Sequence, residues 1–219
     1  MKVFIGVGHG GKDPGACANN MRESDVNLCM ALACQEYLLE HGVECKVSRS
    51  IDENDKLAEE IRECKAFDPD VSLEIHNNSG GGNGFECYVA SPSDPAYRLA
   101  ELIEQEVILS GHKSRGIKIN KRLGWTNSGL KNAVLTEGFF LDGISDSARF
   151  TTNFDQKNLA ICYAKGILNF LGVKEYDNEK EKLMKKVADK YNFARDTIVY
   201  LADYKYGESL LRRLAEYGN

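Results

Sequence analysis

The sequence predicts an α/β domain with a largely parallel sheet. Over residues 1–173, short apolar segments of strand character alternate with amphipathic segments of about 12–18 residues, which is the pattern of strands joined by helices. Hydrophobic residues make up 42% of the 219-residue chain and charged residues 28%, an ordinary composition for a globular protein with a sizeable core.

The N-terminal part begins with a strand, a long helix and a second strand. Residues 2–7 are apolar and run directly into a glycine-rich loop, as a buried strand does. Apolar residues recur every three or four positions over 24–41, which predicts a helix, and Gly42 supplies its end. Residues 43–47 then alternate between apolar and polar side chains, as expected for the next strand.

The middle of the chain continues this alternation. A helix is expected over 55–66, with Leu57 turned inward, and a strand over 71–75. A loop rich in glycine and asparagine follows this strand. The next elements are a strand over 85–90 and a helix over 95–109.

The domain closes with a strand at 133–136 and a helix at 156–171, and the composition then changes. Residues 174–219 carry ten Lys or Arg, nine Asp or Glu and six of the ten tyrosines. Two helices, 178–192 and 195–217, fit this segment, which is too short for a confident core of its own. We expect a small helical appendage that docks on the main domain or on a partner chain.

Composition excludes several classes of protein. The net charge of −5 argues against a nucleic-acid partner, which requires a basic surface, and no run of about 18 apolar residues is present to span a membrane. The first residues lack the apolar region and cleavage site of a signal peptide, so we expect synthesis in the cytoplasm. The seven cysteines contain no C-x-x-C pair, and we interpret them as reduced thiols that fill core space.

Four residues with metal-binding or acid–base side chains stand at the ends of the expected elements. His9 follows the first strand, inside the loop Gly8–Gly15. His76 and Glu137 each follow a later strand, and Glu23 stands at the start of the first long helix. Because ligands bind at the carboxyl ends of the strands in such sheets, we expect these side chains to converge.

Two histidines, one carboxylate and a water make the ligand set of a catalytic zinc ion, at about 2.0–2.2 Å from the metal. A further carboxylate near the water acts as general base and then protonates the leaving amine. The sequence offers Glu23 as the ligand and Glu137 as this acid and base. His41 and His112 each lie beside a glycine at a helix end, and we interpret them as structural.

The glycine loop also matches, in part, a phosphate-binding loop. Residues 6–12 fit G-x-x-x-x-G-K, but Asp13 stands where a Ser or Thr hydroxyl would bind magnesium. Its charge would repel a phosphate, and no helix start follows to hold one. We therefore reject a nucleotide site here.

Several motifs, in order, resemble the zinc-dependent N-acetylmuramoyl-L-alanine amidases of the Amidase_3 type over about residues 1–172. They are Gly8–Ala16, Glu23 with Asn27 and Leu28, Ser48 with Arg49, Ile75–Ser79, and Ala133–Phe140. The resemblance implies a twisted, mostly parallel sheet of about six strands, flanked by helices on both faces.

The resemblance also implies the chemistry. It implies that His9, Glu23 and His76 bind zinc and that Glu137 is the catalytic glutamate. The reaction it implies is hydrolysis of peptidoglycan at the amide between the lactyl group of N-acetylmuramic acid and L-alanine.

One residue departs from the family pattern. Glu74 stands two positions before His76, where the family commonly has a small polar residue, and on a strand both side chains point to the same side. Glu74 either orients a metal ligand, faces a polar neighbour, or rivals Glu137 as base. Asn78 is a further candidate for a supporting or substrate-binding role.

Four interpretations of the function stay open. A wall hydrolase without a signal peptide resembles a phage endolysin, which reaches the wall through holin pores, and a bacterial wall-remodelling amidase is the alternative. A non-catalytic peptidoglycan-binding module and a zinc peptidase of the stem peptide are the others. Residues 174–219 are expected to bind the wall or to form a homodimer.

Overall fold

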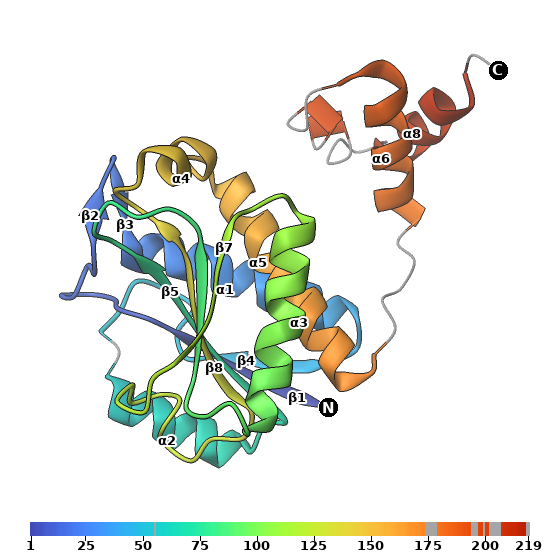
Figure 1. The fold of residues 1–219 in the computed structure, drawn as a ribbon. Helices are drawn as coiled ribbons and strands as arrows, with labels where there is room; N and C mark the ends of the chain where they lie inside the picture. Colours follow the sequence, from blue (N-terminus) through green and yellow to red (C-terminus); the bar gives the residue numbers. More distant parts are fainter. Residues whose placement is uncertain (55, 174–178, 194–196, 199, 202–206, 218–219) are drawn as a thin grey trace. The chain divides into compact units, whose positions relative to one another are not determined.

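The computed structural model describes two compact units, residues 1–174 and 175–219. The residues that it does not describe are 55, 174–178, 194–196, 199, 202–206 and 218–219. The first unit is an α/β domain built around one six-stranded sheet, and the second is helical (Figure 1).

The sheet is mostly parallel, as predicted. Its strands, in spatial order, are β4 (Glu44–Val47), β1 (Lys2–Val7), β5 (Val71–Asn78), β8 (Ala133–Phe140), β6 (Phe85–Val89) and β7 (Ser114–Ile119). Neighbouring strands are parallel except for the pair β8 and β6. A short antiparallel ribbon, β2 (Cys17–Ala18) with β3 (Met21–Arg22), precedes the first helix.

Helices lie on both faces of the sheet, but unequally. One face is covered by α1 (Glu23–Glu40), α3 (Pro95–Leu109) and α5 (Asn153–Leu171), whose apolar residues pack with Val3, Ile5 and Val134 in the main core. The other face holds α2 (Leu57–Phe67), where Phe4 and Ala133 pack against Cys64 and Trp125. Alternation along β1 explains this division, because neighbouring side chains on a strand point to opposite faces.

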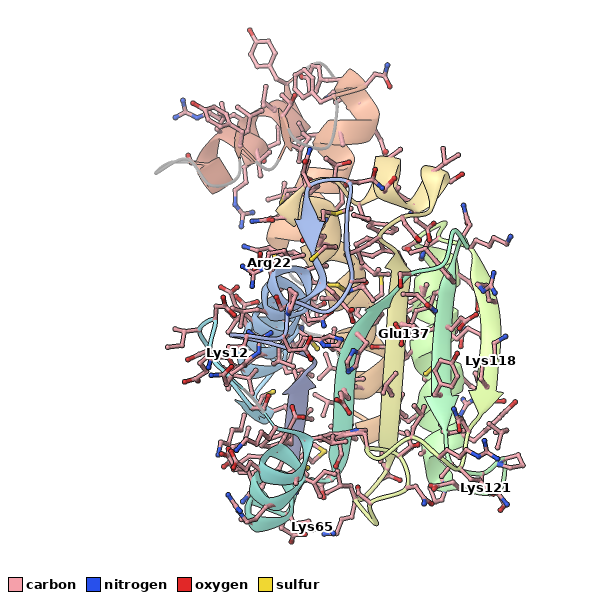
Figure 2. The ribbon with its side chains drawn as sticks, turned by 90° about the vertical axis from the view of Figure 1, so that its left-hand side faces the viewer. Lys12, Arg22, Lys65, Lys118, Lys121 and Glu137 are labelled. Carbon is pink, nitrogen blue, oxygen red and sulfur yellow. The ribbon has the colours of Figure 1, made fainter. Side chains whose placement is uncertain are left out.

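The α2 face stays open over half of the sheet, and this is where the chemistry lies. In Figure 2 this face is turned to the viewer, and no helix of the described residues lies in front of Glu137 or Lys118. On this face β5 carries Glu74 and His76, and β6 carries Glu86.

The structure corrects the expected position of two site residues. His76 and Glu137 lie inside β5 and β8, which continue to Asn78 and Phe140, rather than after the ends of these strands. Their side chains point to the open face. A polar side chain in that direction does not enter the apolar core, so each strand continues past it.

Other local expectations also change. Leu57 is 43% exposed, and the buried side chain on that part of α2 is Glu60, which accepts a hydrogen bond from Val7 N at 2.9 Å. Neither β7 nor the short helix α4 (Ile144–Arg149) was expected. All seven cysteines are free, and most are buried, but Cys17 is exposed on the ribbon.

The second unit has its own small core. Its described helices include α6 (Glu179–Tyr191) and α8 (Gly207–Glu216), and Val187, Ile198 and Leu211 are buried together. The helix expected over 195–217 falls partly outside the described residues, and α8 covers its C-terminal part. None of the helices in the described part of the chain has the length and apolar character that a membrane span requires.

Candidate metal centre

The loop that carries His9 is held by a buried arginine. Arg49 is 2% exposed, and its guanidinium donates hydrogen bonds to the carbonyl oxygens of Val7, Gly8, His9, Ser24 and Ile51. These hydrogen bonds connect the loop to Ser24 at the start of α1. His9 itself has φ 63°, a left-handed conformation that such anchoring stabilises.

Asp13 faces His9 instead of leaving room for a phosphate. The loop closes on itself between Gly10 and Asp13. Asp13 Oδ2 then lies 2.9 Å from His9 Nδ1, which leaves Nε2 on the side of Glu23. A negative charge at this place supports the rejection of a phosphate-binding loop.

Glu23 lies between the two histidines. Its Oε2 is 3.2 Å from His9 Nε2 and its Oε1 is 3.0 Å from His76 Nδ1. One potential ligand atom from each residue lies within 4.8 Å of the others. Backbone N–H groups of Ala16 and Asn77 also donate to the Glu23 carboxylate, so its orientation is set by the fold.

Burial and the neighbouring side chains act in opposite directions on the pKa values of Glu23 and His76. Burial opposes ionisation of Glu23, but hydrogen bonds from His76 and His9 outweigh burial and hold its pKa well below the usual range. Burial likewise opposes charge on His76, yet Glu23 and Glu74 raise its pKa well above the usual value. The carboxylates therefore attract positive charge to one point between the three side chains.

Glu137 lies beside this trio on the next strand. Glu137 in β8 is paired in register with His76 in β5. Its Oε2 atom is buried and accepts no hydrogen bond from any described residue. Burial raises the pKa of Glu137 to about 7. A carboxyl group with such a pKa both takes up and releases a proton near neutral pH.

Glu74 and Asn78 occupy the same face of β5. Glu74 Oε1 lies 3.2 Å from His76 Nε2, so the two ring nitrogens of His76 face two different carboxylates. Asn78 donates a hydrogen bond from Nδ2 to Glu86 Oε2 at 3.3 Å. The expected proximity of Glu74 to His76 is thus present.

Two glycines of the loop provide space for the metal-ligating side chains themselves. A Cβ atom at Gly8 would lie 2.2 Å from His76 Cε1. At Gly15, which has φ 64°, a Cβ would lie 2.6 Å from Glu23 Oε2 and 2.7 Å from His9 Cδ2. Only a residue without a side chain fits at these positions.

The other two histidines lie outside the site. His41 is 6% exposed and its Nδ1 contacts Tyr37 O at 2.7 Å, while His112 is 4% exposed and its Nε2 contacts Gly138 O at 3.1 Å. Both have backbone partners in the core, in agreement with a structural role.

Comparison with known proteins shows the family of this chain. The family described as N-acetylmuramoyl-L-alanine amidase (Amidase_3) matches residues 3–169. The chain belongs to the Amidase_3 family. The match spans the sheet except for Lys2, and α1 to α5 up to two residues before the end of α5.

Two relatives and one solved structure each match a similar share of this chain. The sporulation-specific N-acetylmuramoyl-L-alanine amidase of Bacillus subtilis is 32% identical over 178 residues, which cover 80% of this chain and 70% of that protein. The endolysin of Bacillus phage SPP1 is 30% identical, with 79% and 67% covered. The solved structure of the amidase AmiC2 of Nostoc punctiforme superposes with a TM-score of 0.74 at 27% identity, covering 78% and 97%.

Sequence reasoning did not find every residue around the site of this Amidase_3 domain. Asn27 was noted only as part of a motif, but its Nδ2 donates to Gly8 O at 2.9 Å and its Oδ1 accepts from Asn77. Glu86 and Arg115 were not singled out, although Glu86 is paired in register with Glu137. The apolar alternation of β6, which puts Glu86 opposite the core residues, was the available signal.

Proposed function

We propose that this chain is a zinc-dependent peptidoglycan amidase, which hydrolyses the amide between the lactyl group of N-acetylmuramic acid and L-alanine. His9, Glu23 and His76 hold the metal, and Glu137 is the catalytic acid and base. The observation that carries the proposal is the convergence of these three ligand side chains beside a buried, partly unpartnered carboxylate. Membership of the Amidase_3 family supports it.

The donor set suits zinc. Two imidazoles and one carboxylate leave a fourth position open, as in catalytic zinc sites. The low pKa of Glu23 and the coupled charges of the trio also favour a cation at this point. When bound, zinc lowers the pKa of a water and polarises the amide carbonyl.

The protein's own groups supply the proton transfers. Glu137 takes a proton from the attacking water and returns it to the nitrogen of L-alanine as the amide breaks. Its pKa of about 7 in the metal-free chain places it near the range where both steps are possible. One of its two carboxylate oxygens, Oε2, is buried.

Glu74 and Asn78 take supporting roles in this proposal. Glu74 accepts a hydrogen bond from His76 Nε2, which fixes the tautomer and leaves Nδ1 to the metal, as carboxylates do for many metal-bound histidines. Asn78 orients Glu86 at the edge of the site or contacts the substrate directly.

The test is the Glu137→Gln variant. We expect unchanged zinc content and at least a hundredfold loss of stem-peptide release from purified cell wall, since an amide cannot transfer the proton. Mass spectrometry of wild-type products should find free L-alanine amino termini and intact glycan, and a chelator should abolish release. Near-wild-type activity of the variant would refute the role of Glu137, and cleavage inside the peptide would indicate a peptidase.

The biological setting is a further part of the proposal. We propose a phage endolysin that acts after a holin opens the membrane, and the similarity to the SPP1 endolysin supports this. Similarity to the Bacillus subtilis amidase supports the alternative of wall remodelling. Expression in a Gram-positive host, with and without membrane permeabilisation, separates the two, because an endolysin lyses cells only after permeabilisation.

Residues 174–219 are proposed to bind the wall or to form a homodimer. A wall pull-down of the full chain and of residues 1–174 tests the first role. Light scattering of the full chain tests the second. A full chain that is monomeric and binds wall no better than residues 1–174 would refute both roles.

A further inference from the structure

A bulge in β7 places two cations on one side of the sheet, next to the proposed catalytic glutamate. Phe85 pairs with Ser114 and Cys87 with Ile117, so Arg115 and Gly116 together oppose the single residue Glu86. Gly116 has φ 90°, which suits glycine. Bulges often re-aim side chains beside active sites.

The bulge has a specific consequence for two side chains. Residues three apart on a regular strand point to opposite faces. Arg115 and Lys118 instead both reach the same carboxylate: Arg115 Nε lies 2.5 Å and Lys118 Nζ 3.7 Å from Glu86 Oε1. Both cations therefore lie on the open face, where Figure 2 shows Lys118 on the strand at the edge of the sheet.

Glu86 serves as a buried anchor for these cations. It is 4% exposed, and its second oxygen accepts hydrogen bonds from Tyr88 and Asn78 at 2.7 and 3.3 Å. Burial opposes its ionisation, but Arg115 and Tyr88 outweigh burial and hold the pKa of Glu86 below its usual value. Two cations around one carboxylate leave an excess of one positive charge.

The Arg115 guanidinium is oriented before any ligand arrives. Its Nε donates a hydrogen bond to Glu86, and its Cζ lies 5.0 Å from the ring centroid of Phe140. No described residue accepts a hydrogen bond from its two terminal amino groups, and 38% of its side-chain surface is exposed. Such a fork matches a carboxylate that it binds through two parallel hydrogen bonds.

The proposed reaction limits which part of the substrate can reach Arg115 and Lys118. In the proposed reaction Glu137 must lie within hydrogen-bond reach of the L-alanine nitrogen. The strands β6 and β7 follow β8 on the side away from His76, so a peptide that continues in this direction reaches them. Because the lactyl carboxyl group is consumed in the amide and the sugars are neutral, the carboxylates of this substrate lie on the peptide. β7 is two strands from β8, about 10 Å at the usual strand spacing, which an extended peptide spans in two or three residues.

We propose that Arg115 and Lys118 form a binding site for a free carboxylate of the stem peptide, two or three residues beyond the scissile amide. This inference rests on the proposed amidase function and adds a specificity to it. Arg115 receives the carboxylate through its terminal amino groups, Lys118 adds charge, and Glu86 holds both in place. A stem peptide amidated at that carboxyl group should be a poorer substrate.

The experiment compares two soluble glycan-peptide substrates that differ only in a free acid or a carboxamide on the second residue after the scissile bond. A second pair differs in the same way at the third residue. We expect the wild type to prefer the acid in one pair by about tenfold in kcat/KM, the equivalent of about 1.4 kcal/mol. The Arg115→Gln/Lys118→Gln variant should lose that preference and cleave the acid and the amide at equal rates.

Lys121→Gln is the matched control. Lys121 is an exposed cation beyond the end of β7, and its substitution changes the net charge without touching Glu86 (Figure 2). We expect this variant to retain the wild-type preference. Thermal unfolding followed by fluorescence of Trp125 verifies that each variant is folded.

The outcomes separate this inference from the amidase function. A wild type that cleaves neither substrate of either pair would refute the function itself. A wild type that cleaves acid and amide equally in both pairs, a double variant that keeps the acid preference, or a Lys121→Gln variant that loses it would overturn the carboxylate site while leaving the amidase intact.

Discussion

Glu137 makes a strong, testable contribution to the pH dependence of stability in the metal-free protein. Burial raises its pKa from 4.5 to about 7. Below pH 4.5 the carboxyl group is protonated in both the folded and the unfolded chain, so it does not lower the free energy of unfolding. Above pH 7 it is ionised in both, and the folded chain bears the cost of a buried charge. Stability is therefore lost as the pH rises from 4.5 to 7.

The magnitude follows from the shift. A shift of about 2.5 pKa units corresponds to about 3 kcal/mol when fully developed. At pH 5 ionisation of Glu137 has lowered the free energy of unfolding by less than about 1 kcal/mol, and at pH 8 by nearly the full amount. The Glu137→Gln variant removes the titration, so its stability relative to the wild type should rise by about 2.5 kcal/mol between these pH values.

Urea unfolding in the presence of a chelator measures this difference. The chain has one tryptophan, Trp125, which is 1% exposed in the first unit, so its fluorescence reports the unfolding of that unit alone. Asp68→Asn is a suitable control: the hydrogen bond from Lys131 holds the pKa of Asp68 below its usual value and Asp68 does not act on Glu137, so its stability difference should stay nearly constant from pH 5 to 8. A Glu137→Gln difference that does not change with pH would refute the assignment of a raised pKa to Glu137.

Three further predictions concern the scaffold of the site. Gly8→Ala should weaken zinc binding at least tenfold in a chelator competition, because the new Cβ would lie 2.2 Å from the His76 ring; unchanged affinity would contradict this packing argument. Arg49→Lys should lower the free energy of unfolding of the first unit by about 2–4 kcal/mol in urea titrations, because an ammonium group cannot reach all five carbonyl oxygens, and a loss below about 0.5 kcal/mol would show that these bonds are dispensable. Residues 1–174 alone should unfold cooperatively by Trp125 fluorescence and release stem peptides from soluble substrates at the full-chain rate, whereas an unfolded fragment would show that residues 175–219 are needed for the first unit.

Much of this molecule follows from local patterns in the chain. Periodicity placed α1 and α3 to within one residue, because an amphipathic helix carries its signal every three or four positions. The same patterns put His9, Glu23 and His76 where the topology of a parallel sheet brings residues together. Residue type then limited the chemistry to metal binding and proton transfer.

Patterns were weakest where polar side chains occupy strands. His76 and Glu137 were expected after their strands, because a polar residue normally marks the end of an apolar run. The edge strand β7 carries Ser, Arg, Gly and Lys among its six residues, so it has too little alternation to be recognised. The sequence pattern therefore did not predict that β7 contributes side chains to the site.

The sequence by itself determined the fold class, the order of most elements and the four groups proposed to carry the reaction. Only the tertiary structure decided how those groups are supported: Arg49 across the loop carbonyls, Glu74 on the second nitrogen of His76, and the bulge that turns Arg115 towards Glu86. The physical reason is that helix and strand signals are local. Register, bulges and buried polar contacts arise between segments far apart in the chain and exist only after the sheet has formed.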